Sequence, residues 1–150
     1  MSTEPDLIRL YSARILALAA DMPHTMRLTG PTGTARRRSP LCGSTVTVDV
    51  IVTDSVIREY GQEVKACALG QAAASIVGSA ILGLTKAEVQ RGRDQLYAML
   101  KANGPAPDAP FDGLAVLEPA RDYKNRHASI MLALDATLDA LAQAKTAATA

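Results

Sequence analysis

Residues 44–67, STVTVDVIVTDSVIREYGQEVKAC, decide the fold that we expect for this chain. Four valines at every second position (Val46, Val48, Val50 and Val52) alternate with mostly polar residues, which is typical of a β-strand with one buried face. Asp54-Ser55 then favours a turn, and residues 56–67 return as a second strand. The stretch therefore predicts an antiparallel hairpin whose second strand ends at Cys67.

The segments on either side extend this hairpin into a domain. Before it, Pro5–Ala20 has the apolar spacing of an amphipathic helix, and a loop containing Pro23, Gly30 and Pro31 follows. The segment TARRRS, residues 34–39, is compatible with a short exposed strand or with a basic loop.

The chain after the hairpin is expected to be helical. Residues 68–83 form one helix, and the next begins at Thr85, with Glu88 completing a capping box, and stops at Gly104. Residues 124–150 close the chain as a long helix. Strands followed by helices indicate an α+β domain: a small antiparallel sheet of about three strands with helices packed on one face. We expect a single domain over 1–150, with an N-terminal helix and loop in 1–33 and a frayed tail in 142–150.

Composition excludes several classes of protein. The chain has 150 residues, a formal charge of +1 and two cysteines, which is too few for a disulfide framework and gives no general reason to expect nucleic acid as a partner. The polar, acidic start does not resemble a signal peptide, so we expect a cytoplasmic protein. Residues 66–84 carry no charge but are mostly Ala, Gly and Ser, which favours a packed helix over a membrane span.

Both cysteines lie where structural elements meet. Cys42 precedes the first strand of the hairpin and Cys67 begins the following helix, so an antiparallel hairpin makes them neighbours. A thiolate at a helix N-terminus is favoured by the dipole and the free N–H groups. His127, at the start of the last helix, could join two thiolates on zinc or iron. From spacing alone, inert buried residues are the favoured explanation for both cysteines, and a surface histidine is the usual explanation for His127.

Three stretches, LCGSTVTVDVIV, VKACALGQAAASI and YKNRHASIMLAL, resemble the U-type iron–sulfur cluster assembly scaffolds, the family of IscU, SufU and the NifU N-terminal domain. The resemblance covers about residues 40–141. It matches Cys42-Gly43 to the family's first cysteine and glycine, and Cys67 to its second cysteine, which opens a helix. The family's third cysteine falls where this chain has Arg126-His127.

Two departures from the family bear on the site. Ser44 replaces the acidic residue that follows Cys-Gly in the family, so an oxygen ligand of useful charge is missing. The third cysteine is absent, with His127 as the nearest substitute. The resemblance thus implies three ligands, Cys42, Cys67 and His127, with supporting roles for Gly43, Ser44, Lys65 and Arg126. Lys65 and Arg126 could hold thiolates or sulfide, or could simply be solvated charges.

The resemblance implies a scaffold or carrier that binds iron and an iron–sulfur cluster, not an enzyme. Its expected partners are a cysteine desulfurase and cluster acceptors, and a homo-oligomer is compatible with this role. A basic run, Arg36 to Arg38, is either a soluble strand edge or a docking patch for an acidic partner. Two alternatives stay open: a zinc-dependent, SufU-like sulfur acceptor, and a degenerate member that acts as an interaction module without metal.

Overall fold

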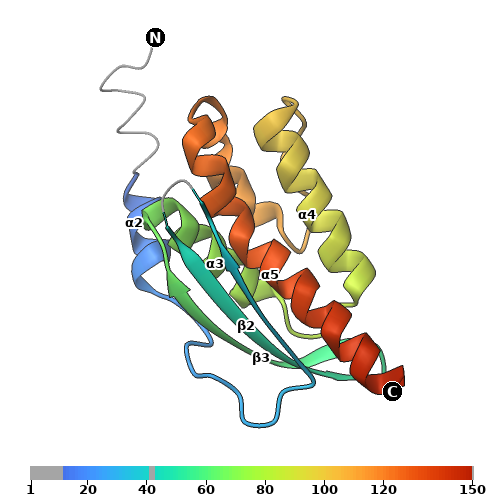
Figure 1. Ribbon diagram of the computed structural model, residues 1–150. Helices are drawn as coiled ribbons and strands as arrows, with labels where there is room; N and C mark the ends of the chain where they lie inside the picture. Colours follow the sequence, from blue (N-terminus) through green and yellow to red (C-terminus); the bar gives the residue numbers. More distant parts are fainter. Residues whose placement is uncertain (1–11, 41–42, 150) are drawn as a thin grey trace.

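The computed structural model describes residues 12–40 and 43–149, with side chains through Ala144 (Figure 1). Its elements in chain order are α2 (Ala13–Ala20), β1 (Gly33–Arg38), β2 (Thr45–Thr53), β3 (Val56–Lys65), α3 (Ala68–Ala80), α4 (Lys86–Lys101), the 3-10 helix η1 (Asp112–Asp122) and α5 (Lys124–Thr149). The α+β class, the three-stranded antiparallel sheet, the N-terminal helix and the long C-terminal helix are as predicted.

The sheet has the order β1-β2-β3, and both pairings are antiparallel. Asp54 and Ser55 connect β2 to β3 with positive φ at both residues, the geometry of a two-residue type I′ turn. The register places Thr45 opposite Lys65 on one side and opposite Arg38 on the other. The basic segment after Gly33 is therefore an edge strand, and the ends of β1 and β3 flank the start of β2.

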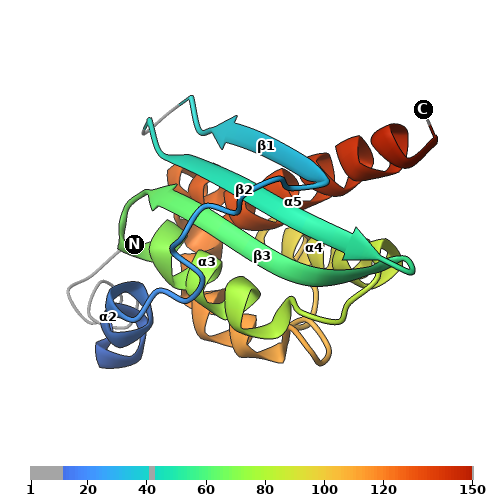
Figure 2. The ribbon, with the colours of Figure 1, turned by 90° about the horizontal axis from the view of Figure 1, so that it is seen from below.

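Helices α3 and α5 cover one face of the sheet, with α4 packed against the outer side of α5 (Figures 1 and 2). The alternating valines of β2 point into this layer, where Val46, Val48 and Val50 are buried. Helix α3 is enclosed on several sides, and its buried residues Ala72, Ala73 and Ala74 have small side chains that permit close packing of its neighbours. No helix in the described part of the chain is long and apolar enough to span a bilayer.

Residues 21–32, which we call the strap, cross the opposite face of the sheet (Figure 2). The strap is held by a carboxylate on β2: Asp49 accepts hydrogen bonds from Arg27 Nε at 2.6 Å and from the Leu28 N–H at 3.0 Å. Gln62 donates its backbone N–H to the His24 carbonyl at 2.8 Å. The face of the sheet without helices is thus covered by the chain's own loop.

Several boundaries differ from the sequence-based expectations. The first part of the predicted helix Pro5–Ala20 lies outside the described residues, and the described part begins at Ala13. Helix α5 continues to Thr149, and the expected fraying of residues 142–150 stays a prediction. The capping box of Thr85 and Glu88 is confirmed. Residues 112–122 form a 3-10 helix that contains Pro119.

Candidate functional site

Cys67 is the N-cap residue of α3, directly after the end of β3. Its backbone is extended, with φ −67° and ψ 170°, and its side chain makes no capping hydrogen bond. The carbonyl of Cys67 accepts the first bond of the helix, from the Gln71 N–H at 2.9 Å. The thiol is half-buried. It is therefore positioned at the start of a helix without being used to cap it.

A buried serine from α5 contacts this thiol. Ser129 Oγ lies 3.5 Å from Cys67 Sγ, and the same hydroxyl donates to Ser44 Oγ at 3.3 Å. Ser44 and Ser129 are both buried. Two hydrogen bonds thus join the start of β2, the start of α5 and the start of α3.

The loop that leads into β2 is closed by backbone hydrogen bonds. The Ser39 N–H donates to the Ser44 carbonyl at 2.8 Å, and the Gly43 N–H donates to the Ser39 carbonyl at 2.9 Å. Gly43 has φ +70°, a conformation that suits glycine. Cys42 lies outside the described residues, and Ser44, two positions after it, is hydrogen-bonded to Ser129.

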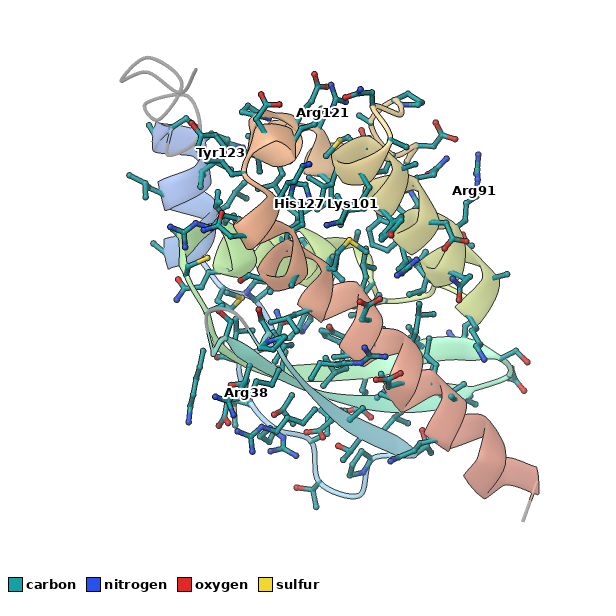
Figure 3. All side chains as sticks on the ribbon, turned by 45° about the horizontal axis from the view of Figure 1, so that its top comes forward. Arg38, Arg91, Lys101, Arg121, Tyr123 and His127 are labelled. Atoms are coloured by element: carbon teal, nitrogen blue, oxygen red, sulfur yellow. The ribbon has the colours of Figure 1, made fainter. Side chains whose placement is uncertain are left out.

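His127 has a different environment from Cys67. Its Nε2 lies 2.9 Å from the Ala120 carbonyl and 3.0 Å from the Arg121 carbonyl, both on η1. Figure 3 shows the ring at the start of α5 near Arg121 and Lys101. Burial lowers the pKa of His127, the bond to the Ala120 carbonyl raises it, and the charge of Lys101 lowers it again; the net shift is downward. Because both carbonyls can only accept, Nε2 carries a proton, and the lowered pKa favours the neutral form of the imidazole.

The other ring nitrogen of His127 is available as a donor atom. Nδ1 is buried and has no hydrogen-bond partner in the described part of the structure. Histidines that bind metals commonly donate the second ring N–H to a carbonyl, which fixes the tautomer and leaves one lone pair for the metal. The Nε2 bonds to η1 reproduce this arrangement. His127 thus fits the donor chemistry expected of a ligand.

The structure brings Cys67 together with Ser44, but it does not bond His127 to either of them. His127 and Ser129 are two positions apart on α5, and residues two apart on a helix point about 200° from one another around the axis. Of these two residues, Ser129 is the one that reaches Cys67. Within residues 12–40 and 43–149, no group of three His, Cys, Asp or Glu side chains is close enough to hold a metal ion. The full ligand set stays a prediction, because Cys42 is not among these residues.

The remaining predicted site residues surround this junction. Lys65 is exposed at the end of β3, and Arg126 is half-buried in the first turn of α5. Arg38, which we had treated only as part of a basic run, has its guanidinium next to Gly43: a Cβ on that glycine would lie 3.9 Å from the nearest nitrogen. Ser129 was not predicted at all, because nothing in its local sequence distinguishes it from an ordinary helical serine.

Comparison with solved structures identifies the family. The chain superposes on the N-terminal NifU-like protein of Brucella abortus with a TM-score of 0.92 and 43% sequence identity, over 94% of this chain and 98% of the other. The chain belongs to the NifU-like family of U-type scaffold proteins. Membership of this family agrees with the expectation from sequence that the chain is not an enzyme.

More distant structures share the NifU-like fold. An iron–sulfur cluster assembly scaffold protein for the SUF system from Fervidobacterium islandicum AW-1 superposes with a TM-score of 0.79 at 19% identity, over 89% of this chain and 98% of that one. A hypothetical protein gives a TM-score of 0.74 at 20% identity, over 90% and 98% of the two chains. No protein-family model and no curated protein matches the sequence.

Proposed function

We propose that this protein is a scaffold on which an iron–sulfur cluster is assembled and from which it is passed to an acceptor protein. The observation that carries the proposal is that Cys67 and Ser44, which is two positions after Cys42, share one hydrogen-bond partner. Ser129 contacts both residues and so holds the start of β2 against the start of α3. Membership of the NifU-like family supports the same role.

The ligands in this proposal are the thiolates of Cys42 and Cys67 and Nδ1 of His127. The buried Nδ1 without a described partner supports the third assignment. A neutral imidazole in place of a thiolate lowers the negative charge around a cluster and raises its reduction potential. With three protein ligands, one position stays open, which suits a cluster that must leave.

The same proposal covers partners and location. A cysteine desulfurase would supply the sulfur, and an apo acceptor would receive the cluster. Arg36 and Arg38 point to the same face of the edge strand, since alternate residues of a strand share a face, and they are exposed there. These two cations, of which Arg38 lies next to Gly43, would favour an acidic surface on the partner. We place this chemistry in the cytoplasm, where thiols stay reduced.

Substitution of the ligands tests the proposal. After anaerobic reconstitution with iron and sulfide, Cys42→Ser and Cys67→Ser are expected to hold no cluster, because each removes a thiolate ligand. His127→Ala is expected to hold a cluster that is lost faster on dilution or exposure to an acceptor. The measurement is iron and sulfide content after gel filtration, with the visible spectrum.

The matched control is His24→Ala, which removes the other histidine, an exposed residue of the strap. This variant should keep the wild-type content of iron and sulfide. Wild-type metal content in the Cys42, Cys67 and His127 variants, with the fold intact by circular dichroism, would refute the ligand assignment.

A further inference from the structure

Two buried hydroxyl groups connect the Cys67 sulfur to the start of β2. Ser129 Oγ lies between them, 3.5 Å from Cys67 Sγ and 3.3 Å from Ser44 Oγ. Only 1% of Ser129 and 4% of Ser44 is exposed to solvent. The two serine hydroxyls that form this chain of hydrogen bonds are therefore shielded from competing water.

The packing of α3 against α5 leaves room for this hydroxyl and for little else. A Cβ at Gly70 would lie within 2.4 Å of Ser129 Oγ and 2.9 Å of the Ala66 side chain. Gly70 lies in the first turn of α3, where glycine has a lower helix propensity than alanine. The missing side chain at position 70 is what allows Ser129 to reach Cys67.

We propose that Ser129 is a positioning residue that donates a hydrogen bond to the Cys67 sulfur when that sulfur acts as a ligand, and that Ser44 orients the Ser129 hydroxyl. The inference rests on the proposed function, because it assigns Cys67 to the cluster. It gives roles to two serines, and the role of Ser44 is that of a hydrogen-bond partner, not of an oxygen ligand to metal.

Both hydroxyls can rotate, so the chain of hydrogen bonds can run in either direction. With a proton on sulfur, Cys67 donates to Ser129, and Ser129 donates to Ser44, as in the present structure. When a metal or an electrophile takes the place of that proton, the sulfur has nothing to donate. Ser129 then turns to donate to the sulfur, and Ser44 donates to Ser129.

A hydrogen bond to a ligating thiolate withdraws charge from it, which raises the reduction potential of a cluster and tunes how firmly the sulfur holds iron. The same bond stabilises the sulfur anion through which alkylation proceeds. One hydroxyl thus predicts two measurable effects, one with the cluster bound and one without it.

The first test uses the apo protein. In a Cys42→Ser background Cys67 is the single thiol of the chain, since the sequence has two cysteines. Adding Ser129→Ala is expected to slow alkylation by iodoacetamide at pH 7 about fivefold, the effect of losing one hydrogen bond. Ser44→Ala, which leaves Ser129 in place, is expected to slow it by about twofold. Gly70→Ala should resemble Ser129→Ala, because the new Cβ displaces the hydroxyl.

The control is Thr137→Ala, which removes another buried hydroxyl from α5, one that bonds to Tyr60 and the Ala133 carbonyl instead of to Cys67. It should lower stability without changing the rate of alkylation. Equal rates for Ser129→Ala, Ser44→Ala and the Cys42→Ser parent would overturn the inference.

The second test separates this inference from the proposed function. In reconstituted protein, Ser129→Ala is expected to lower the reduction potential of the cluster relative to wild type. If wild-type protein binds no cluster, the proposed function fails, while the alkylation rates still decide whether Ser129 bonds to the sulfur. If a cluster forms and its potential and the alkylation rates are the same in Ser129→Ala, the proposed function stands and the role of Ser129 is refuted.

Discussion

Replacing Gly33 with alanine is expected to destabilise the protein by about 3 kcal/mol or more, at the upper end of overpacking substitutions. The new Cβ would lie 2.0 Å from the carbonyl oxygen of Ala140 and 3.0 Å from the Ala144 nitrogen. These are backbone atoms of α5, which cannot turn aside as a side chain can. The helix as a whole would have to move away from β1.

That movement would break further bonds between the edge strand and the helix. The Thr34 N–H donates to Gln143 Oε1 at 3.0 Å, and Arg37 pairs with Asp139 at 2.5 Å. Equilibrium unfolding in urea measures the change. Gly113→Ala is the control, because its Cβ would lie 3.2 Å from a side-chain methyl of Ile76 and should cost less than about 1 kcal/mol. Near-wild-type stability of Gly33→Ala would contradict the close packing of α5 on β1.

Replacing Asp49 with alanine is expected to cost about 3 kcal/mol and to loosen the strap. The carboxylate is fully buried, and it accepts hydrogen bonds from Arg27, from the Leu28 N–H and from the Thr34 hydroxyl. Its loss leaves the Leu28 N–H without this acceptor beneath the strap. Urea unfolding measures the stability, and cleavage by trypsin after Arg27 reports on the strap.

The exposed carboxylate of Asp139 provides the control for Asp49. Its pair with Arg37 is half-exposed on both sides, so Asp139→Ala should cost less than about 1 kcal/mol. An Asp49→Ala protein as stable as Asp139→Ala, with unchanged cleavage by trypsin, would contradict the buried anchor.

The difference in stability between wild type and Asp49→Ala should depend on pH. Burial raises the pKa of Asp49, but the hydrogen bonds from Arg27, Thr34 and Leu28 outweigh it, so the net pKa is lowered. A carboxylate with a lowered pKa stabilises the folded state above its unfolded value of about 3.9, and that contribution is lost as the pH falls further. The difference between the two proteins should therefore shrink below about pH 3.9.

The sequence predicts elements whose signals are local. The alternating valines define β2, Asp54-Ser55 defines the turn, and Thr85 with Glu88 marks the start of α4. Each of these signals depends on residues within a few positions of one another. The basic segment 34–39 stayed ambiguous because its partner in the sheet, not its own composition, makes it a strand.

Features that depend on distant partners could not be predicted. Asp49 is one of the polar residues of β2, which the alternating pattern places on the side that faces solvent. The strap covers it instead, through Arg27 and Leu28, which are 22 and 21 positions earlier in the sequence. The local pattern does not explain why position 61 is a glycine, because the irregular register of the hairpin lies elsewhere, at Ile51/Val52. Gly61 is instead needed because a Cβ there would lie 2.4 Å from the Met26 carbonyl of the strap.

The candidate site likewise combines a local feature that the sequence predicts with long-range contacts that it does not. Cys67 at the start of a helix follows from the hairpin and is confirmed by its position as N-cap of α3. Ser129 is 62 positions from Cys67 and 85 from Ser44 in the sequence. Its contacts with them depend on how α5 packs, which the local sequence does not indicate. The bonds from His127 to η1 required a 3-10 helix that the sequence did not indicate.

The most direct test of the central claim is the content of iron, sulfide and zinc in wild-type protein after anaerobic reconstitution, together with its visible absorption spectrum. A cluster scaffold is expected to hold iron and sulfide in equal amounts and to show sulfur-to-iron charge-transfer bands. Zinc alone would instead indicate the sulfur-acceptor alternative. A colourless protein without metal would contradict the claim that this member of the NifU-like family assembles a cluster.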